Sequence, residues 1–123
     1  MARKGSSGEC TTDEKVKRYE MLSPILDGVY KEVKELSKKK QDDVLNKLKV
    51  TMVNRILGQI KELLEDEPTI QFMDLLDDET LPTNSDAVLI LAQFRAAMDQ
   101  YKERYYRLDA SIYEHRWFTK ENP

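Results

Sequence analysis

Large apolar residues recur at alternating spacings of three and four over the last third of the chain. The run comprises Leu91, Phe94, Met98, Tyr101, Tyr105, Leu108 and Ile112. This is the heptad spacing of a helix that packs along a seam. It predicts one helix over residues 85–118, about 50 Å long at a rise of about 1.5 Å per residue. A helix of that length exceeds what shorter neighbours can easily cover.

Two shorter helices are expected before this one. Thr11 with Glu14 three residues later is a capping pattern, and it predicts a short helix that ends near residue 22. Ser23 and Pro24 then predict a new or kinked helix, because serine suits the N-cap and proline suits the first turn. The stripe of that helix is Leu26, Val29, Val33 and Leu36.

The apolar residues between these two regions have an average spacing of about 3.6, which is typical of a straight amphipathic helix. We expect this helix to begin at Asp42 or Asp43 and to end near Asp66. A short helix over 68–77 and a loop over 77–83 should follow. The residues of the stripe are Leu45, Leu48, Met52, Ile56, Ile60 and Leu63.

Together these stripes predict an all-α fold. We expect an antiparallel helical bundle of about four main helices, a short extra helix in an acidic segment and a long C-terminal helix. The four glycines and four prolines are too few for the many turns of a sandwich or barrel. Residues 1–10 should form a flexible tail and residues 11–123 a single domain. The expected core is Leu26, Val29, Val33, Leu45, Leu48, Met52, Ile56, Ile60, Leu91, Phe94, Met98, Tyr101, Tyr105 and Leu108.

Cysteine usage and hydropathy predict a cellular compartment. The only cysteine is Cys10, so one chain cannot form a disulfide, and nothing marks the protein as secreted. The first residues lack the apolar stretch of a signal peptide. No apolar run approaches the ~20 residues that span a bilayer. We therefore expect a cytoplasmic protein that does not contact a membrane.

Charge is segregated along the chain although the net charge is only −3. Residues 62–86 hold nine acids and no lysine or arginine, whereas residues 21–61 hold nine basic residues against five acids, a net of +4. Acids interleaved with apolar groups suit docking into a basic, apolar-floored groove of a partner protein. The alternative is that the segment only caps the bundle. Its candidate contact residues are Phe72, Asp74, Asp77 and Asp78.

A second stripe is expected on another face of the last helix, and it consists of Tyr106, Ala110, Tyr113 and Trp117. Tyrosine, tryptophan and arginine are enriched at binding hot spots, so Arg116 and Phe118 complete this candidate surface. We expect the surface to bind a protein partner or a second copy of the chain. The alternative is that residues 1–22 fold back over it.

Patterns for catalysis or metal binding are mostly missing. His115 is the only histidine, which excludes zinc sites built on histidine or cysteine pairs within one chain. All-helical nucleotide pyrophosphohydrolases hold Mg²⁺ with carboxylates three residues apart on a helix. Glu62 with Glu65, and Asp74 with Asp77, have that spacing. The second pair lacks the glutamate that the Glu-x-x-Asp motif of those enzymes would supply.

The favoured hypothesis is a non-enzymatic protein-interaction or regulatory protein without catalytic residues, bound metal or cofactor. Two alternatives stay open. The lysine-rich half, residues 31–61, suits salt-sensitive binding of nucleic acid, although the net negative charge argues against a dedicated binder. The carboxylate pairs suit a Mg²⁺-dependent nucleotide pyrophosphohydrolase.

Overall fold

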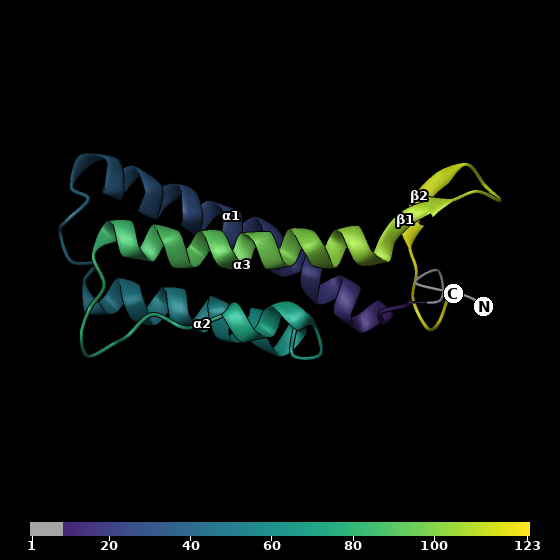
Figure 1. Ribbon diagram of the computed structural model, residues 1–123, viewed down its shortest axis with the longest axis horizontal. Helices are drawn as coiled ribbons and strands as arrows, with labels where there is room; N and C mark the ends of the chain where they lie inside the picture. The colour runs from purple at the N-terminus through teal and green to yellow at the C-terminus, as the bar shows by residue number, and fades with distance from the viewer. Residues whose placement is uncertain (1–8) are drawn as a thin grey trace.

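Three α-helices form the body of the protein in a computed structural model that describes residues 9–123. They are α1 (Asp13–Lys39), α2 (Lys47–Leu63) and α3 (Asn84–Tyr105) (Figure 1). A β-hairpin follows α3, formed by β1 (Tyr106–Asp109) and β2 (Glu114–Trp117). The fold is therefore mostly helical, but the predictions of four main helices and of a strictly all-α fold are wrong. No helix in the described range is long and apolar enough to cross a membrane.

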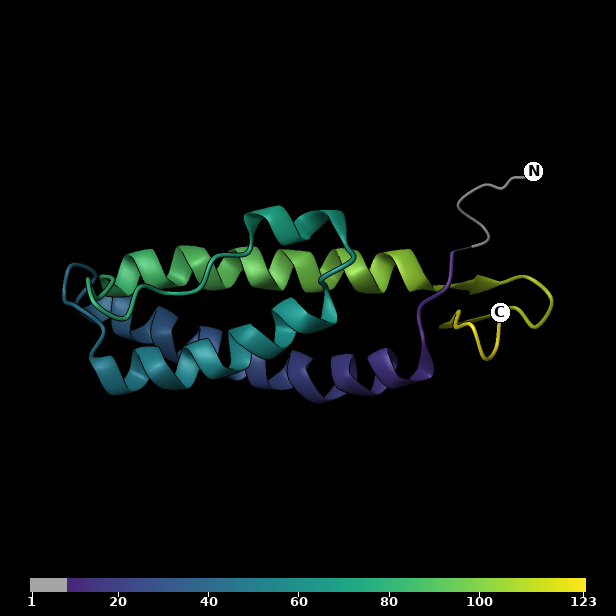
Figure 2. The same cartoon turned by 90° about the horizontal axis from the view of Figure 1, so that it is seen from below.

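The direction of the helices differs in part from the predicted antiparallel bundle. α1 runs antiparallel to both other helices, but α2 and α3 run the same way (Figure 1). Their N-termini lie together, because the Asn84 amide donates to the Asp43 carbonyl at 2.8 Å and Val44 pairs with Thr83. Two parallel helices need a long connection that runs back along the bundle. Residues 64–83 form this connection, which we call the return segment (Figure 2).

The expected break at Ser23 and Pro24 is absent, since α1 continues through both residues. Pro24 lacks a backbone N–H and removes one helical hydrogen bond. Leu22 and Leu26 lie on either side of it, and both are buried in the core. Their burial holds the two halves of α1 against the bundle. Thr12 caps the helix by accepting from the Lys15 amide at 3.2 Å.

Most of the expected core is confirmed, but α2 is rotated from its predicted face. Leu48 and Met52 are 70% and 55% exposed, so placing them in the core was wrong. α1 and the return segment cover a different side of α2 instead. Asn46, not Asp42 or Asp43, caps this helix by accepting from the Lys49 amide at 2.9 Å. The side that is buried carries Val50, Val53, Leu57, Ile60 and Leu63.

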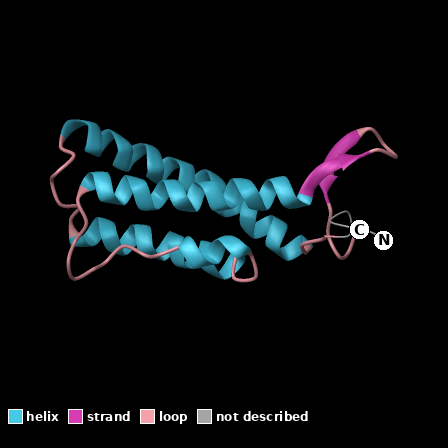
Figure 3. Cartoon of the chain, viewed as in Figure 1, coloured by secondary structure: helices cyan, strands magenta, loops and turns pink. Residues whose placement is uncertain are grey.

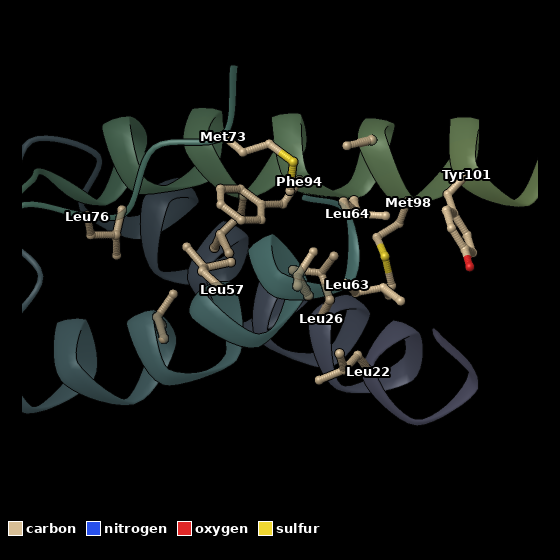
Figure 4. Close-up of a cluster of buried hydrophobic side chains, with 14 of the residues drawn as sticks. Leu22, Leu26, Leu57, Leu63, Leu64, Met73, Leu76, Phe94, Met98 and Tyr101 are labelled. Atoms are coloured by element: carbon tan, nitrogen blue, oxygen red, sulfur yellow. The ribbon is translucent and has the colours of Figure 1, made fainter. Parts of the chain in front are cut away.

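The return segment is not the helix predicted over 68–77. A 3-10 helix, η2 (Pro68–Phe72), ends at Phe72 and extended chain follows. Met73 and Leu76 both insert into the core, where Met73 lies next to Phe94 (Figure 4). The Asn54 side chain fixes this strand-like stretch, donating to the Leu76 carbonyl at 2.8 Å and accepting from the Leu76 amide at 2.9 Å.

The long C-terminal helix is also wrong beyond Tyr105, where the chain turns into the hairpin (Figure 3). Leu108 and Ile112 are 57% and 50% exposed, so the heptad seam stops at Tyr105. α1 begins at Asp13, at the same end of the bundle, and offers nothing to cover a longer α3. By folding back, the chain packs the partly buried Trp117 against the core.

Candidate functional site

The hairpin has one aromatic face. Its register pairs Tyr106 with Trp117 and Leu108 with His115. These four side chains lie on the same side, because successive residues of a strand alternate between the two faces. The ring centroid of Tyr106 lies 5.4 Å from that of Trp117 and 5.8 Å from that of His115. Two candidate residues, Tyr106 and Trp117, are therefore brought together, although on strands and not on a helix.

The base of this face is held by the helices. Trp117 meets Tyr19 of α1 edge-on, with 5.2 Å between ring centroids, and lies 6.1 Å from Tyr101 of α3. Tyr19 and Tyr101 stack at 5.6 Å. Tyr19 belongs to residues 1–22, which the alternative expected over the aromatic stripe, and it covers the partly buried Trp117 ring in part. Tyr19 carries that contact, and its helical spacing from Leu22 and Leu26 was the sequence signal for it.

The opposite face of the hairpin is charged and occupied within the chain. Phe118 lies between two guanidinium groups, with Arg107 at 4.3 Å and Arg116 at 4.0 Å from the ring centroid. Arg116 also donates to Asp109 at 2.7 Å and to the carbonyls of Asn122 and Pro123. Arg116 and Phe118, both candidates for partner binding, therefore act inside the molecule as supports of the hairpin.

A pairing between the two ends of the described chain locks the hairpin base. We call it the terminal clasp and define it as Thr11 with residues 118–120. The Thr11 amide donates to the Phe118 carbonyl at 3.0 Å, and the Lys120 amide donates to the Thr11 carbonyl at 2.8 Å. The Thr11 hydroxyl also shares a hydrogen bond with the Tyr101 hydroxyl. Most of the predicted tail 1–10 lies outside the described residues.

A carboxylate network ties the end of α3 to the return segment. Glu67 accepts from Arg104 at 2.9 Å and from the Tyr105 hydroxyl at 2.8 Å. Arg104 also pairs with Glu9 at 2.9 Å. Burial, with the Glu67 hydrogen bond, raises the pKa of Tyr105 to about 12. The phenol therefore stays protonated as a donor, and the network holds the point from which the hairpin leaves α3.

The tip of the hairpin is apolar and exposed, in contrast to its base. We define the tip as Leu108, Ile112 and Tyr113, which are 57%, 50% and 87% exposed. Tyr113 has a φ of 57°, in the left-handed region that residues other than glycine rarely adopt. Such backbone conformations persist only where the surroundings enforce them, and they cluster at functional sites. Sequence analysis selected Tyr113 but placed Leu108 and Ile112 in a buried seam.

Asp109 builds the turn below this tip. Its Oδ1 accepts from the Ser111 amide at 3.0 Å and from the Ser111 hydroxyl at 2.6 Å, and the Ile112 amide donates to its carbonyl at 3.2 Å. These are features of a turn that starts at aspartate. An aspartate followed two residues later by serine was a local signal for the turn, and the heptad spacing obscured it.

The turn should therefore be sensitive to acid. Hydrogen bonds from the Ser111 hydroxyl, then from Arg116 and the Ser111 amide, lower the pKa of Asp109 to about 2. A carboxyl whose pKa falls on folding adds stability that is complete above its unfolded pKa of about 4 and is lost as the pH drops through the folded value. We expect the Ser111 amide chemical shift to titrate near pH 2. Titration near pH 4 would contradict these bonds, and Asp109→Asn is the control without a titration.

The acidic segment offers a second exposed surface. Phe72 is 64% and Leu75 43% exposed, and Asp74, Asp77 and Asp78 are exposed beside them. The amides of Glu79 and Thr80 donate to Asp77 and lower its pKa, so Asp77 also shapes a turn. η2 lies alongside α3, whereas the hairpin projects past the end of that helix (Figure 2). The two predicted surfaces are thus separate.

The residues behind the two alternative functions differ in how the fold arranges them. Asp74 and Asp77 follow η2 in extended chain, so their spacing does not place them on one helix face. Within residues 9–123, no group of three or more histidine, cysteine, aspartate or glutamate side chains is arranged to hold a metal ion. Three lysines, Lys39, Lys40 and Lys49, line an open hollow of about 360 Å³ between α1 and α2, together with Asp43.

Comparison with known proteins adds no assignment to this geometry. No protein-family model matches the chain, and neither the curated proteins nor the solved structures include a significant match.

Proposed function

We propose that the protein is a non-enzymatic interaction module that presents the hairpin tip to an apolar pocket on a partner protein. One observation carries the proposal: Tyr113 is 87% exposed and is held in a left-handed backbone conformation. Folding gains nothing from exposing a large aromatic ring on an unfavourable backbone. Binding to a partner would account for this arrangement, because tyrosines are frequent binding hot spots.

The construction of the hairpin supports the same proposal. Trp117 and the terminal clasp fix the base, and the Asp109–Arg116 pair at 2.7 Å joins its strands. A preorganised contact loses less conformational entropy on binding than a mobile one does. The tip can therefore use its apolar area for affinity instead of offsetting the cost of becoming ordered.

The acidic segment fits a supporting contact with the same class of partner. Phe72 is an exposed aromatic ring among exposed acids, and the cation Arg104 already pairs with Glu67 of this segment. A partner with basic residues around its apolar pocket would complement these acids and associate faster at low salt. The segment is a second element of the proposal and is not required for the contact at the tip.

Tyr113→Asn is the variant that tests the proposal. Asparagine tolerates the left-handed conformation, so the turn should survive while the aromatic ring is lost. Loss of a hot-spot side chain typically costs ~2 kcal/mol or more, which is about a thirtyfold loss of affinity. We expect affinity capture from the source cells to recover specific proteins with the wild-type chain and to lose them with Tyr113→Asn.

Leu89→Gln is the matched control. Leu89 is the one large apolar residue of α3 that is exposed, at 62%, so its replacement removes a similar apolar surface far from the turn. This variant should recover the same proteins as the wild type, and circular dichroism should confirm that both variants stay folded. Equal recovery by all three chains would refute a role for the tip.

A further inference from the structure

The hollow between the end of α1 and the start of α2 combines basic and apolar lining. Lys39, Lys40 and Lys49 surround it, and Asp43 is the acidic residue among the described residues that line it. Its volume of about 360 Å³ lies within the range of about 300–1,000 Å³ that is usual for ligand pockets. We define the basic hollow as these three lysines together with Leu36, Val44 and Leu45, which supply its apolar lining.

The lysines of the basic hollow have little to neutralise them. Within residues 9–123, the ammonium groups of Lys39 and Lys49 form no ion pair. Lys40 Nζ lies 3.9 Å from a carboxylate oxygen of Asp43, and both side chains are largely exposed, so this pair adds little stability. Three ammonium groups against one carboxylate leave an excess of positive charge. Apolar lining next to that charge suits a ligand that is both acidic and apolar.

The return segment carries that combination on its outer side. The chain is extended after Phe72, and the side chains of Met73 and Leu76 are buried, so their exposed neighbours face away from the body. The carboxylates of Asp74 and Asp78 form no ion pair within the described chain. We define the acidic edge as the exposed residues Phe72, Asp74, Leu75 and Asp78.

The acidic edge does not cover the basic hollow of its own chain. η2 lies alongside the middle of α3, whereas the connection from α1 to α2 lies at one end of the bundle (Figure 2). Asn54 holds Leu76 through two hydrogen bonds, and the burial of Met73 holds the chain next to Phe72. The edge is therefore fixed to the body and cannot swing over the hollow.

We propose that the acidic edge of one copy docks in the basic hollow of a second copy. The two surfaces have opposite charges, and both carry apolar side chains. Contact between unlike surfaces is therefore attractive, whereas hollow against hollow or edge against edge would place like charges together. The copies meet head to tail in a heterologous interface. This inference builds on the proposed role of the acidic segment as a contact surface and does not involve the hairpin tip.

Phe72 is the anchor of this contact. An aromatic side chain that enters a pocket and loses its contact with water is a frequent hot spot. Phe72 is 64% exposed, and the hollow offers its ring the apolar side chains of Leu36 and Leu45. Asp74 follows two residues later, about 7 Å along extended chain, so its carboxylate reaches the exposed lysines around the hollow when Phe72 enters it.

Sedimentation velocity at about 200 µM chain tests the proposal, because small interfaces are weak. We expect the wild type to associate at about 50 mM salt and to associate less at about 500 mM salt, which screens exposed charges. A hollow variant, Lys39→Glu with Lys49→Glu, and an edge variant, Phe72→Ser with Asp74→Asn, should each weaken association by roughly thirtyfold or more. All four side chains are exposed, so both variants should stay folded.

Mixing these two variants is the decisive measurement. The hollow variant keeps its acidic edge, and the edge variant keeps its basic hollow. An equal mixture should therefore form 1:1 pairs although neither variant associates alone, and growth should stop at the pair. A contact that uses the same patch of both copies would not be restored in this way, since each mixed pair would contain a damaged patch.

Lys31→Glu with Arg55→Glu is the control for net charge. These two residues are exposed on α1 and α2 outside the hollow, so this variant gains the same negative charge as the hollow variant and should still associate. Leu89→Ser is the control for the loss of Phe72, because the two side chains are 62% and 64% exposed, and it should associate like the wild type.

Three results would overturn the proposal. They are a monomeric wild type at low salt, an association that salt does not weaken, and a mixture of the two variants that stays monomeric. Tyr113→Asn should leave the association between copies unchanged, because Tyr113 belongs to neither surface. Partner capture through the hairpin tip is thus a separate measurement, and it can fail or succeed independently.

Discussion

Trp117→Ala is expected to lower the free energy of unfolding by about 3 kcal/mol and to release the hairpin from the bundle. The Trp117 ring contacts Tyr19 of α1, Tyr101 of α3 and Tyr106 of β1. Those contacts are the main aromatic link between the hairpin and the helices. A two-stranded hairpin is marginally stable by itself, so the strands should lose their order together with the anchor.

Urea unfolding followed by circular dichroism measures this loss, because the variant no longer contains a tryptophan fluorophore. Tyr113→Asn at the tip is the control, and it should change the free energy of unfolding by no more than about 0.5 kcal/mol since Tyr113 is 87% exposed. Slowed exchange of the Phe118 amide, which donates to the Tyr105 carbonyl, should disappear in Trp117→Ala only. An unchanged unfolding midpoint would show that Trp117 is not the anchor.

The helical body was predictable where burial and periodicity coincide. Leu91, Phe94 and Tyr101 lie on the predicted seam of α3, and each is at most 1% exposed. The seam follows from the sequence because one continuous partner surface covers that side of the helix. In α2, apolar periodicity alone did not identify the buried face. Its apolar residues occupy more than one side, and tertiary packing selected the side with Val50 over the side with Leu48.

The hairpin was not predictable from the same spacing. Leu108 and Ile112 continue the alternation of three and four, although they lie in or beside strands and are exposed. Spacing alone does not distinguish helix from strand over so few residues. The β-preferring tyrosines and tryptophan and the Asp109 turn favoured strands, and the contact of Trp117 with residues nearly a hundred positions earlier decided the outcome.

The candidate site was predictable in composition but not in arrangement. Tyr113 and Trp117 were both selected from the sequence, and the structure separates them into an exposed tip and a partly buried base. Arg116 and Phe118 were selected for hot-spot chemistry, yet cation–π contact and hydrogen bonds within the chain occupy them. Residue types indicate where binding chemistry is present. Only the fold determines which of those groups faces outward.

Asn54→Ala is expected to destabilise the protein by about 2–3 kcal/mol through a segment more than twenty residues away. The Asn54 amide makes both of its hydrogen bonds to the backbone of Leu76, and the Leu76 side chain is only 3% exposed. Removing the amide leaves a backbone donor and a backbone acceptor without a partner, each at a cost of about 1–3 kcal/mol when buried. Partial access of water at this half-buried site keeps the total near the lower end.

Loss of the Asn54 hydrogen bonds should also loosen the extended chain around Met73 and Leu76. Met73 and Leu76 hold extended chain against the core without a neighbouring strand, so Asn54 takes the place of a strand partner. We expect the Leu76 amide to exchange with solvent much faster in Asn54→Ala. In Asn54→Asp, which keeps the acceptor and loses the donor, protection should be partial. Gln59→Ala on the exposed side of α2 should leave the protection of the Leu76 amide unchanged. Full protection of that amide in Asn54→Ala would show that the Asn54 side chain does not hold this segment.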